Sequence, residues 1–125
     1  MSDTPMPVVY TAGPFTAETA WRIEQNIRCA EEYGLGVAEM DASPIIPHAN
    51  TRFFHGEGSP EFWYRATEAL LLKSDAILML PNWTTSRGAV NERSLAEAHR
   101  IKVCSSLSEL KYWLARRQQE QDVIK

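Results

Sequence analysis

The sequence contains few cysteines and no long hydrophobic run. Cys29 and Cys104 are the only two cysteines, too few for a disulfide framework, and both have apolar neighbours, so we expect two buried thiols. No run approaches the roughly 18 apolar residues that a membrane-spanning helix needs. Residues 1–7 lack the basic and apolar regions of a signal peptide. These absences predict a cytoplasmic protein without a membrane partner.

The sequence also lacks a strong charge of either sign. Its formal net charge is -3, which gives no electrostatic reason to expect a nucleic-acid polymer or an anionic membrane as partner. Glycine and proline are sparse, at six and seven of 125 residues, and 44% of the residues are hydrophobic. This composition predicts a single domain over residues 1–125, and it leaves open a small, locally bound ligand that can be an anion.

Hydrophobic patterning predicts alternating strands and helices. The expected strands are residues 7–11, 43–47, 76–80 and 102–104, and the expected helices are residues 17–41, 59–73, 88–100 and a last one opening at Ser106. A loop is expected from His48 to about Gly58. Gly34 and Gly36 leave open a break near Tyr33 in the first helix, because glycine costs about 1 kcal/mol relative to alanine.

This alternation is typical of a parallel sheet with helices on both faces. Ligands of such sheets bind at the carboxyl ends of the strands, near the point where the strand order reverses. The rule selects three loops, namely residues 12–16, 48–54 and 81–88. The first has a single glycine and matches neither the dinucleotide fingerprint nor the P-loop.

The third loop carries the side chains best suited to a nucleotide. Trp83 offers a stacking face, and Ser86 and Arg87 are anion-binding groups directly before a helix that begins at Gly88. Glu92 follows four residues later, so its carboxylate can point back into the same crevice. The alternative is a solvated acid placed favourably near the start of a helix.

The second loop adds His48 and Asn50, which can hydrogen-bond to a sugar or a base. His55 and His99 have no partner pattern. The histidines and cysteines lack zinc-ligand spacing, and no G-x-S-x-G elbow occurs. We therefore expect neither a metal site nor serine hydrolase chemistry, and the function favoured below requires no organic cofactor.

Four motifs resemble one enzyme superfamily when taken in order. They are Tyr10-x-x-Gly13-Pro14, Pro47-His48-x-Asn50-Thr51, Ser74-Asp75-Ala76-Ile77 and Trp83-x-x-Ser86-x-Gly88-Ala89-x-x-Glu92. Together they are similar to the nucleoside 2-deoxyribosyltransferase-like superfamily, over about residues 7 to 104. Within it the sequence resembles a compact bacterial and phage branch and the deoxynucleoside 5'-monophosphate N-glycosidases.

The resemblance implies a flavodoxin-like (Rossmann-like) three-layer sandwich with a four- to five-stranded parallel sheet. It implies that Glu92 attacks the anomeric carbon of a nucleoside or nucleoside monophosphate. Tyr10 and His48 match residues near the sugar and the leaving base, and Tyr10 is expected to share the catalytic site. Ser86 and the amide of Gly88 match positions that hold a 5'-phosphate or 5'-hydroxyl.

The same resemblance extends the substrate-binding set into the other loops. The expected substrate-binding residues are Gly13, Pro14, Phe15, His48, Asn50, Trp83, Ser86, Arg87 and Gly88. Relatives are usually dimers or larger, so the resemblance also implies a homo-oligomer.

Two positions depart from the pattern of the superfamily. Thr67 stands where relatives commonly carry an active-site aspartate, with Glu68 beside it on another helical face, and Thr16 replaces a phosphate-binding arginine. Three functions therefore stay open. The first is an N-glycoside hydrolase or N-deoxyribosyltransferase, the second is a silent nucleotide-binding or sensing protein, and the third is an NAD-cleaving glycohydrolase. Asp75, at the entry to a strand, is expected to be structural.

The aromatic content supports the expectation of a homodimer or larger homo-oligomer. Six large aromatic side chains exceed what so small a core readily hides, namely Trp21, Phe53, Phe54, Phe62, Trp63 and Trp113. Exposed aromatic patches mark protein interfaces. The alternative is that most of the six belong to the core.

Overall fold

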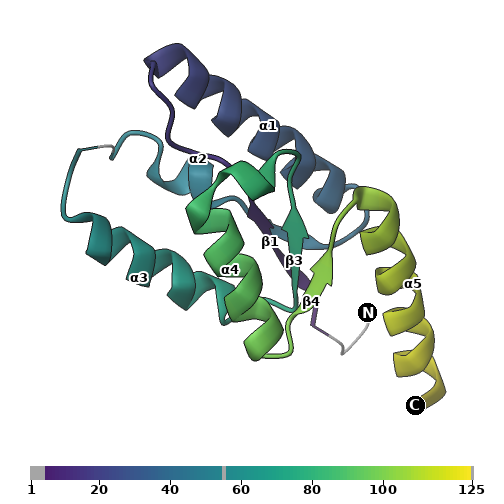
Figure 1. The fold of residues 1–125 in the computed structure, drawn as a ribbon. Helices are drawn as coiled ribbons and strands as arrows, with labels where there is room; N and C mark the ends of the chain where they lie inside the picture. Colours follow the sequence, from purple (N-terminus) through teal and green to yellow (C-terminus); the bar gives the residue numbers. More distant parts are fainter. Residues whose placement is uncertain (1–4, 55, 125) are drawn as a thin grey trace.

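The computed structural model describes residues 5–54 and 56–124. Its strands are β1 (Val8–Ala12), β2 (Ser43–Ile45), β3 (Ala76–Met79) and β4 (Lys102–Cys104). Its helices are α1 (Ala20–Ala38), α2 (Pro47–Thr51), α3 (Pro60–Leu71), the 3-10 turn η1 (Trp83–Thr85), α4 (Arg87–Ala98) and α5 (Leu107–Ile124). Figure 1 shows their arrangement.

The four strands form one parallel sheet in the order β2-β1-β3-β4. Tyr10 of β1 lies between Ile45 of β2 and Ile77 of β3 in the register. The chain moves outward from β1 in one direction to β2 and in the other to β3 and β4. The strand order therefore reverses between β1 and β3, which is the expected position of a ligand site.

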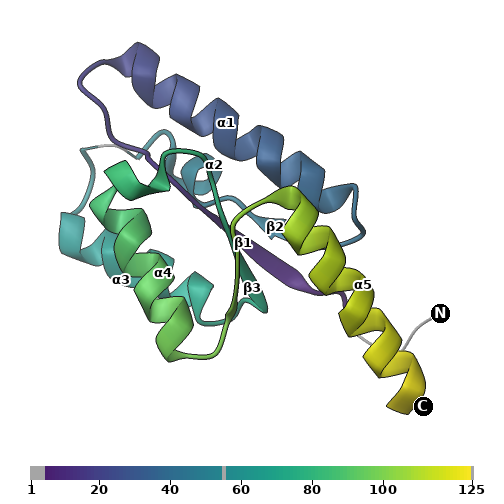
Figure 2. The same ribbon diagram turned by 45° about the vertical axis from the view of Figure 1, so that its right-hand side comes forward.

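Helices cover both faces of the sheet, with α1 and α5 on one face and α3 and α4 on the other (Figure 2). Side chains alternate between faces along a strand. Accordingly Val9 packs in a core cluster with Val37 of α1 and Leu110 of α5. Tyr10 packs in a second cluster with Leu71 of α3 and residues of α4. The α/β three-layer sandwich with a parallel sheet is confirmed, and it has four strands in the described residues.

Local signals explain most of the helix boundaries. Ser59 accepts a hydrogen bond from the Phe62 amide at 3.2 Å, which confirms the predicted start of α3. Ser106 likewise caps α5 through the Glu109 amide at 3.1 Å. The Glu109 carboxylate reaches back to the Ser105 amide, one residue earlier than the capping box predicts.

One prediction about the first half of the chain is confirmed and another is wrong. The single long helix is confirmed, because α1 continues through Tyr33 without a break, and a Cβ added at buried Gly34 would clash with Ile46. The region after β2 is not all loop, since it contains α2, which begins at Pro47. Proline is favourable at the first position of a helix, so Pro47 was a local signal for α2 that the predicted elements did not include.

The ends of α1 also differ from the predicted range of 17–41. Thr19 caps the helix through the Arg22 amide at 3.2 Å, so α1 begins at Ala20. At the other end, α1 stops at Ala38, and Asp41 has a φ of 61°. A left-handed residue cannot continue an α-helix, which explains the earlier end.

Asp75 and the cysteines have structural positions. The Asp75 carboxylate accepts a hydrogen bond from the Val8 amide at 2.8 Å and lies 3.7 Å from Arg117, so it fastens the start of β1. Cys104 is buried as predicted, and burial raises the pKa of its thiol to about 11. Cys29 is only partly buried, which corrects the expectation for that residue.

Candidate functional site

Tyr10 and Glu92 form a hydrogen-bonded pair between the sheet and α4. The Tyr10 hydroxyl donates to Glu92 Oε2 across 82 residues of sequence. Tyr10 is fully buried in the middle of β1, and Glu92 is partly buried. The fold thus joins the two residues that the sequence selects as catalytic.

The small residues of α4 explain why Glu92 points inward. Ala89 and Ala96 are buried against the sheet, and Glu92 lies three residues after the first and four before the second. Residues at this spacing share one helical face. Ser86 starts the helix by accepting a hydrogen bond from the Ala89 amide at 3.2 Å. Glu92 is therefore the one acid on a face of α4 that is otherwise apolar and buried.

Burial controls the ionisation of this pair. It raises the pKa of Glu92 from 4.5 to about 7, the hydrogen bond from Tyr10 opposes this effect, and the negative charge of Glu68 adds to it. Burial and the negative charge of Glu92 also raise the pKa of Tyr10. Tyr10 therefore stays a neutral donor at pH 7, while Glu92 exchanges its proton near neutral pH.

Helix α3 supplies two further groups next to the pair. Thr67 lies close enough to the Tyr10 oxygen to lower the pKa of Tyr10, although its hydroxyl donates to the carbonyls of Trp63 and Tyr64 at 3.0 and 3.1 Å. Glu68 is exposed, and its charge acts on both members of the pair. An exposed carboxylate thus lies next to Thr67 and acts on the Tyr10–Glu92 pair from the same helix.

A second group of expected residues surrounds His48. His48 Nε2 lies 3.2 Å from the carbonyl oxygen of Gly13 and 2.9 Å from that of Pro14, so Nε2 carries the proton and donates to both. The ring of Phe15 meets the His48 ring edge-on at 5.6 Å. His48 therefore fastens the loop after β1 to α2.

Burial favours the neutral form of the His48 imidazole. It is only 5% exposed, and burial lowers its pKa, opposed by the hydrogen bonds to the Pro14 and Gly13 carbonyls. Its Nδ1 atom is buried and has no hydrogen-bond partner among residues 5–54 and 56–124. Asn50, expected beside it, is exposed, and its side chain makes no hydrogen bond within that part of the chain.

Gly13 is required by the close approach of β1 and β3. A Cβ at this position would lie 2.7 Å from Leu80 Cβ and 2.9 Å from Leu80 Cδ1. Leu80 is buried, and its amide donates to the Ala12 carbonyl at 2.8 Å, so neither chain can easily move away.

We therefore expect Gly13→Ala to lower the free energy of unfolding by about 1–3 kcal/mol, the usual cost of overpacking a core. Gly88→Ala is the control, since a Cβ there meets only Ser86 Oγ at 3.8 Å. The control should stay within about 1 kcal/mol of wild type, because alanine is the better helix former. Urea denaturation measures both, and equal stabilities would show that the Gly13 contact is not restrictive.

The third group lies at the start of α4. Arg87 is exposed at the first position of α4, Gly88 follows it, and the Ser86 hydroxyl is used as the helix cap. Trp83 is partly buried against the core cluster on the α3 and α4 face. The guanidinium of Arg93 lies 4.9 Å from the Trp83 ring centroid. Sequence reasoning did not select Arg93, whose only signal is its place next to Glu92.

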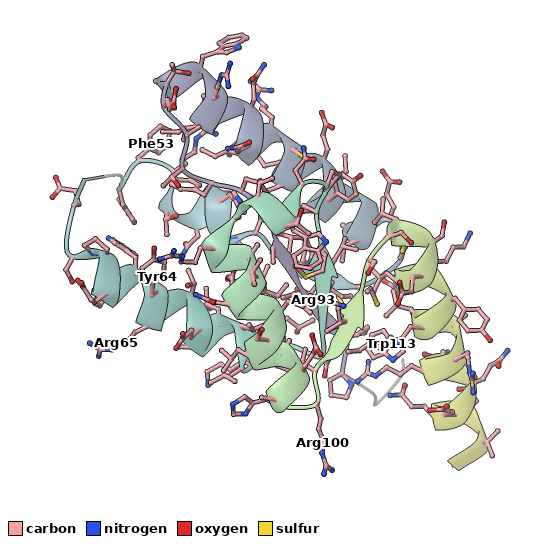
Figure 3. All side chains as sticks on the ribbon, in the orientation of Figure 1. Phe53, Tyr64, Arg65, Arg93, Arg100 and Trp113 are labelled. Atoms are coloured by element: carbon pink, nitrogen blue, oxygen red, sulfur yellow. The ribbon has the colours of Figure 1, made fainter. Side chains whose placement is uncertain are left out.

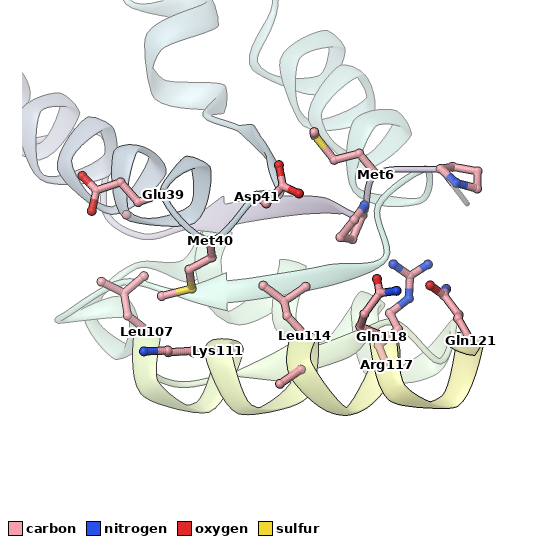
Figure 4. A pocket seen from close by; sticks show the side chains of 14 residues that line it. Met6, Glu39, Met40, Asp41, Leu107, Lys111, Leu114, Arg117, Gln118 and Gln121 are labelled. Atoms are coloured by element: carbon pink, nitrogen blue, oxygen red, sulfur yellow. The ribbon is translucent and has the colours of Figure 1, made fainter. Parts of the chain in front are cut away.

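Glu92 does not line either of two cavities that lie among the described residues. The larger of these two, of about 870 Å³, lies between α1, α5 and residues 5–7, away from the pair (Figure 4). The smaller, of about 350 Å³, lies at the carboxyl ends of β3 and β4 and includes Trp83. It also includes Tyr33 and Ser106, which the sequence did not suggest. The expected residues thus form three groups, and of these residues only Trp83 lines one of the two cavities.

The structure contains no arrangement suited to a metal ion within the residues it describes, since no three histidine, cysteine, aspartate or glutamate side chains gather there. His99 is exposed after α4, and His55 lies outside the described residues. No helix in the same residues is both long and apolar enough to cross a membrane.

Comparison with known proteins gives one finding. The family model described as Domain of unknown function (DUF4406) matches residues 7–105. No curated protein matches the chain. The matched range includes the whole sheet, the Tyr10–Glu92 pair and the His48 group, and it ends before α5. Because this range is most of the 125 residues, the chain belongs to the DUF4406 family.

Proposed function

We propose that the protein cleaves or transfers the N-glycosidic bond of a nucleoside or nucleoside 5'-monophosphate, with Glu92 as nucleophile. The supporting observation is the hydrogen bond between Tyr10 and Glu92, next to the point where the strand order reverses. A buried acid held by a single donor, with its pKa near the operating pH, is typical of catalytic carboxylates. The resemblance of the sequence to nucleoside 2-deoxyribosyltransferase-like enzymes gives the substrate class.

The proposed reaction has two steps. The ionised Glu92 carboxylate bonds to the anomeric carbon while the bond to the base nitrogen breaks, and the base leaves with the bonding electron pair and takes a proton from the solvent. Water or a second base then attacks the same carbon, gives up a proton to the solvent and releases the Glu92 carboxylate. Water gives hydrolysis and a second base gives transfer, and neither step needs a metal.

Tyr10 has the role of a positioning donor in this scheme. Its hydroxyl fixes one oxygen of Glu92 and leaves the other for attack, and it favours the ionised form of the carboxylate. The backbone around Gly88 at the start of α4, with the exposed Arg87, is the proposed site for a 5'-phosphate. Neutral His48 is proposed to contact the sugar or the leaving base.

Base release tests this proposal. The protein is incubated with nucleosides, 2'-deoxynucleosides, their 5'-monophosphates and NAD, and free base is measured by chromatography. A second base is added in parallel to detect transfer. Release from a nucleoside or monophosphate supports the proposal, release of nicotinamide alone from NAD favours the third function, and no release from any compound contradicts an enzymatic role.

Tyr10→Phe tests the role of the tyrosine. The variant loses the hydrogen bond that favours ionised Glu92, so the pKa of Glu92 rises above about 7. We expect the acidic limb of the pH–rate profile to move to higher pH by about one unit, with most activity restored at high pH. Thr11→Val, which changes a buried hydroxyl on the opposite face of β1, is the control. If the midpoint of the acidic limb does not move in Tyr10→Phe, Tyr10 does not set the ionisation of Glu92 and its proposed role is wrong.

A nucleotide-binding protein without turnover is the second candidate. It is favoured by Thr67, whose hydroxyl donates to its own helix at the position where relatives carry an acid. Thermal shift with the same compounds separates the two candidates, because a ligand that binds the native state raises the melting temperature whether or not it reacts. Stabilisation without product would support the binding role.

A cytoplasmic location and self-association are proposed with this function. Of the aromatic side chains expected at an interface, Trp21, Phe53, Phe54 and Phe62 are exposed, whereas Trp63 is partly buried. Trp113 of α5, labelled in Figure 3, packs against the core cluster on the α1 and α5 face.

A further inference from the structure

The loop between β1 and α1 has three successive carbonyls that side chains of two helices bind. His48 of α2 donates from Nε2 to the carbonyl oxygens of Gly13 and Pro14, at 3.2 and 2.9 Å. Asn26 of α1 donates from Nδ2 to the carbonyl oxygen of Phe15 at 3.1 Å. Figure 1 shows the loop running from β1 past α2 to the start of α1. The two side chains therefore fix the orientation of three peptide groups in a segment outside any helix or strand.

Peptide geometry then sets the direction of the amide groups of Phe15 and Thr16. In a planar trans peptide, the C=O of one residue and the N–H of the next point in opposite directions. No cis peptide bond occurs among the residues that the structure describes. The Phe15 N–H therefore points away from His48, and the Thr16 N–H points away from Asn26. Proline has no N–H, so Pro14 adds no third donor.

These directions lead toward the expected ligand position. Helix α2 follows β2, which lies on the opposite side of β1 from β3, so an N–H that points away from α2 points toward the β3 side. Helix α1 covers the face opposite to α3 and α4, so an N–H that points away from α1 points toward the face of the Tyr10–Glu92 pair (Figure 2). The strand order reverses between β1 and β3, where ligands of parallel sheets bind.

Both amide groups lack an internal partner. Within the part of the chain that the structure describes, neither the Phe15 N–H nor the Thr16 N–H donates to a backbone or side-chain acceptor. Contacts nearby hold them in place, because Gly13 packs against Leu80 and the Phe15 ring meets the His48 ring edge-on at 5.6 Å. Two donors held in this way are preorganised for acceptor oxygens, since little conformational entropy is lost when a ligand binds.

We propose that the amides of Phe15 and Thr16 bind acceptor oxygens of the substrate, and that Asn26 is a positioning residue that orients the Thr16 amide through the Phe15 carbonyl. This inference rests on the proposed function, whose substrate carries such oxygens on its sugar and, in a monophosphate, on its phosphate. Both sources offer the same chemistry to a backbone N–H, although a charged phosphate oxygen forms the stronger hydrogen bond.

Amide NMR of the 15N-labelled Glu92→Gln variant tests the site, because this variant should bind substrate without consuming it. The probes are a 2'-deoxynucleoside, its 5'-monophosphate and inorganic phosphate. We expect the amide proton resonances of Phe15 and Thr16 to move downfield as a probe saturates the protein, since a new hydrogen bond to oxygen deshields the proton.

The probes also identify the source of the oxygens. Movement with the nucleoside assigns a sugar oxygen, and movement with the monophosphate or inorganic phosphate alone assigns a phosphate oxygen. If neither resonance moves with any probe, the inference is wrong. Base release by the wild type is measured separately, so this result leaves the proposed nucleophile in place. Movement of the resonances without base release by the wild type supports the inference together with the nucleotide-binding candidate.

Asn26→Leu, made in the same Glu92→Gln protein, tests the positioning role by removing the donor at similar size. We expect the dissociation constant of the probe that moves the resonances to rise about fivefold, the worth of one hydrogen bond, and the movement of Thr16 to shrink. Gln25→Leu is the matched control, since Gln25 is exposed on the same helix, and it should change the dissociation constant by less than about twofold. A folded Asn26→Leu protein that binds like the control would show that Asn26 does not orient the loop.

Discussion

Glu92→Gln is expected to lower the rate of base release by at least about a thousandfold, because it removes the nucleophile and keeps the size of the side chain. The glutamine oxygen still accepts the hydrogen bond from Tyr10, so the pair should keep its geometry. Initial rates at pH 8, where Glu92 is mostly ionised in the wild type, give the largest difference.

Glu97→Gln is the matched control for this loss. Glu97 lies on the same helix and is exposed, and its nearest cation is Arg93 at 3.8 Å. Its replacement should leave the rate within about twofold of wild type, since exposed ion pairs contribute little. Brief reaction followed by acid quench and intact-protein mass measurement should show a glycosyl adduct in the wild type and none in Glu92→Gln. Base release that persists in Glu92→Gln would refute the nucleophile assignment.

The same substitution is expected to change the pH dependence of stability. The folded state holds a proton on Glu92 up to about pH 7, whereas the unfolded chain releases it near 4.5. The contribution of Glu92 to stability is therefore complete below pH 4.5 and is lost as the pH rises through 7. The shift corresponds to at most about 3 kcal/mol.

We expect Glu92→Gln to be close to wild type in stability at pH 5 and more stable at pH 8, by up to about 3 kcal/mol. Urea denaturation at both pH values measures the difference. The pH dependence of the wild type alone does not isolate Glu92, because buried His48 has a lowered pKa and contributes stability that is lost as the pH falls. The difference in the free energy of unfolding between variant and wild type cancels the contribution of His48. A difference that does not change between pH 5 and 8 would show that Glu92 titrates as an ordinary acid.

The candidate site was predictable from the sequence where a local rule places the residue. Ser59 and Pro60 mark the start of α3, and the four-residue step from Gly88 to Glu92 keeps the acid near the start of α4. The pattern of apolar residues predicted all four strands of the described sheet and its longer helices. It did not find α2, because five residues are too few to show a helical period.

Contacts between distant segments could not be predicted from the residues alone. The hydrogen bond from Tyr10 to Glu92, the two carbonyls that His48 binds and the stacking of Arg93 on Trp83 all join separate elements. The charge of Glu68 also reaches the pair from α3, although the sequence placed it on another helical face than Thr67. Local periodicity carries no information about these distances.

Alternation, helix caps and apolar runs act over a few residues, and they were enough to predict the parallel α/β architecture and the three loops at the carboxyl ends of its strands. The packing of the helices on the sheet, in contrast, places Glu92 partly buried against Tyr10, where burial raises its pKa to about 7, and it forms the groove of about 870 Å³ on the other face beside α5. Burial and electrostatic coupling depend on which elements meet in space, and the strand order and helix packing fix that only when the whole chain has folded.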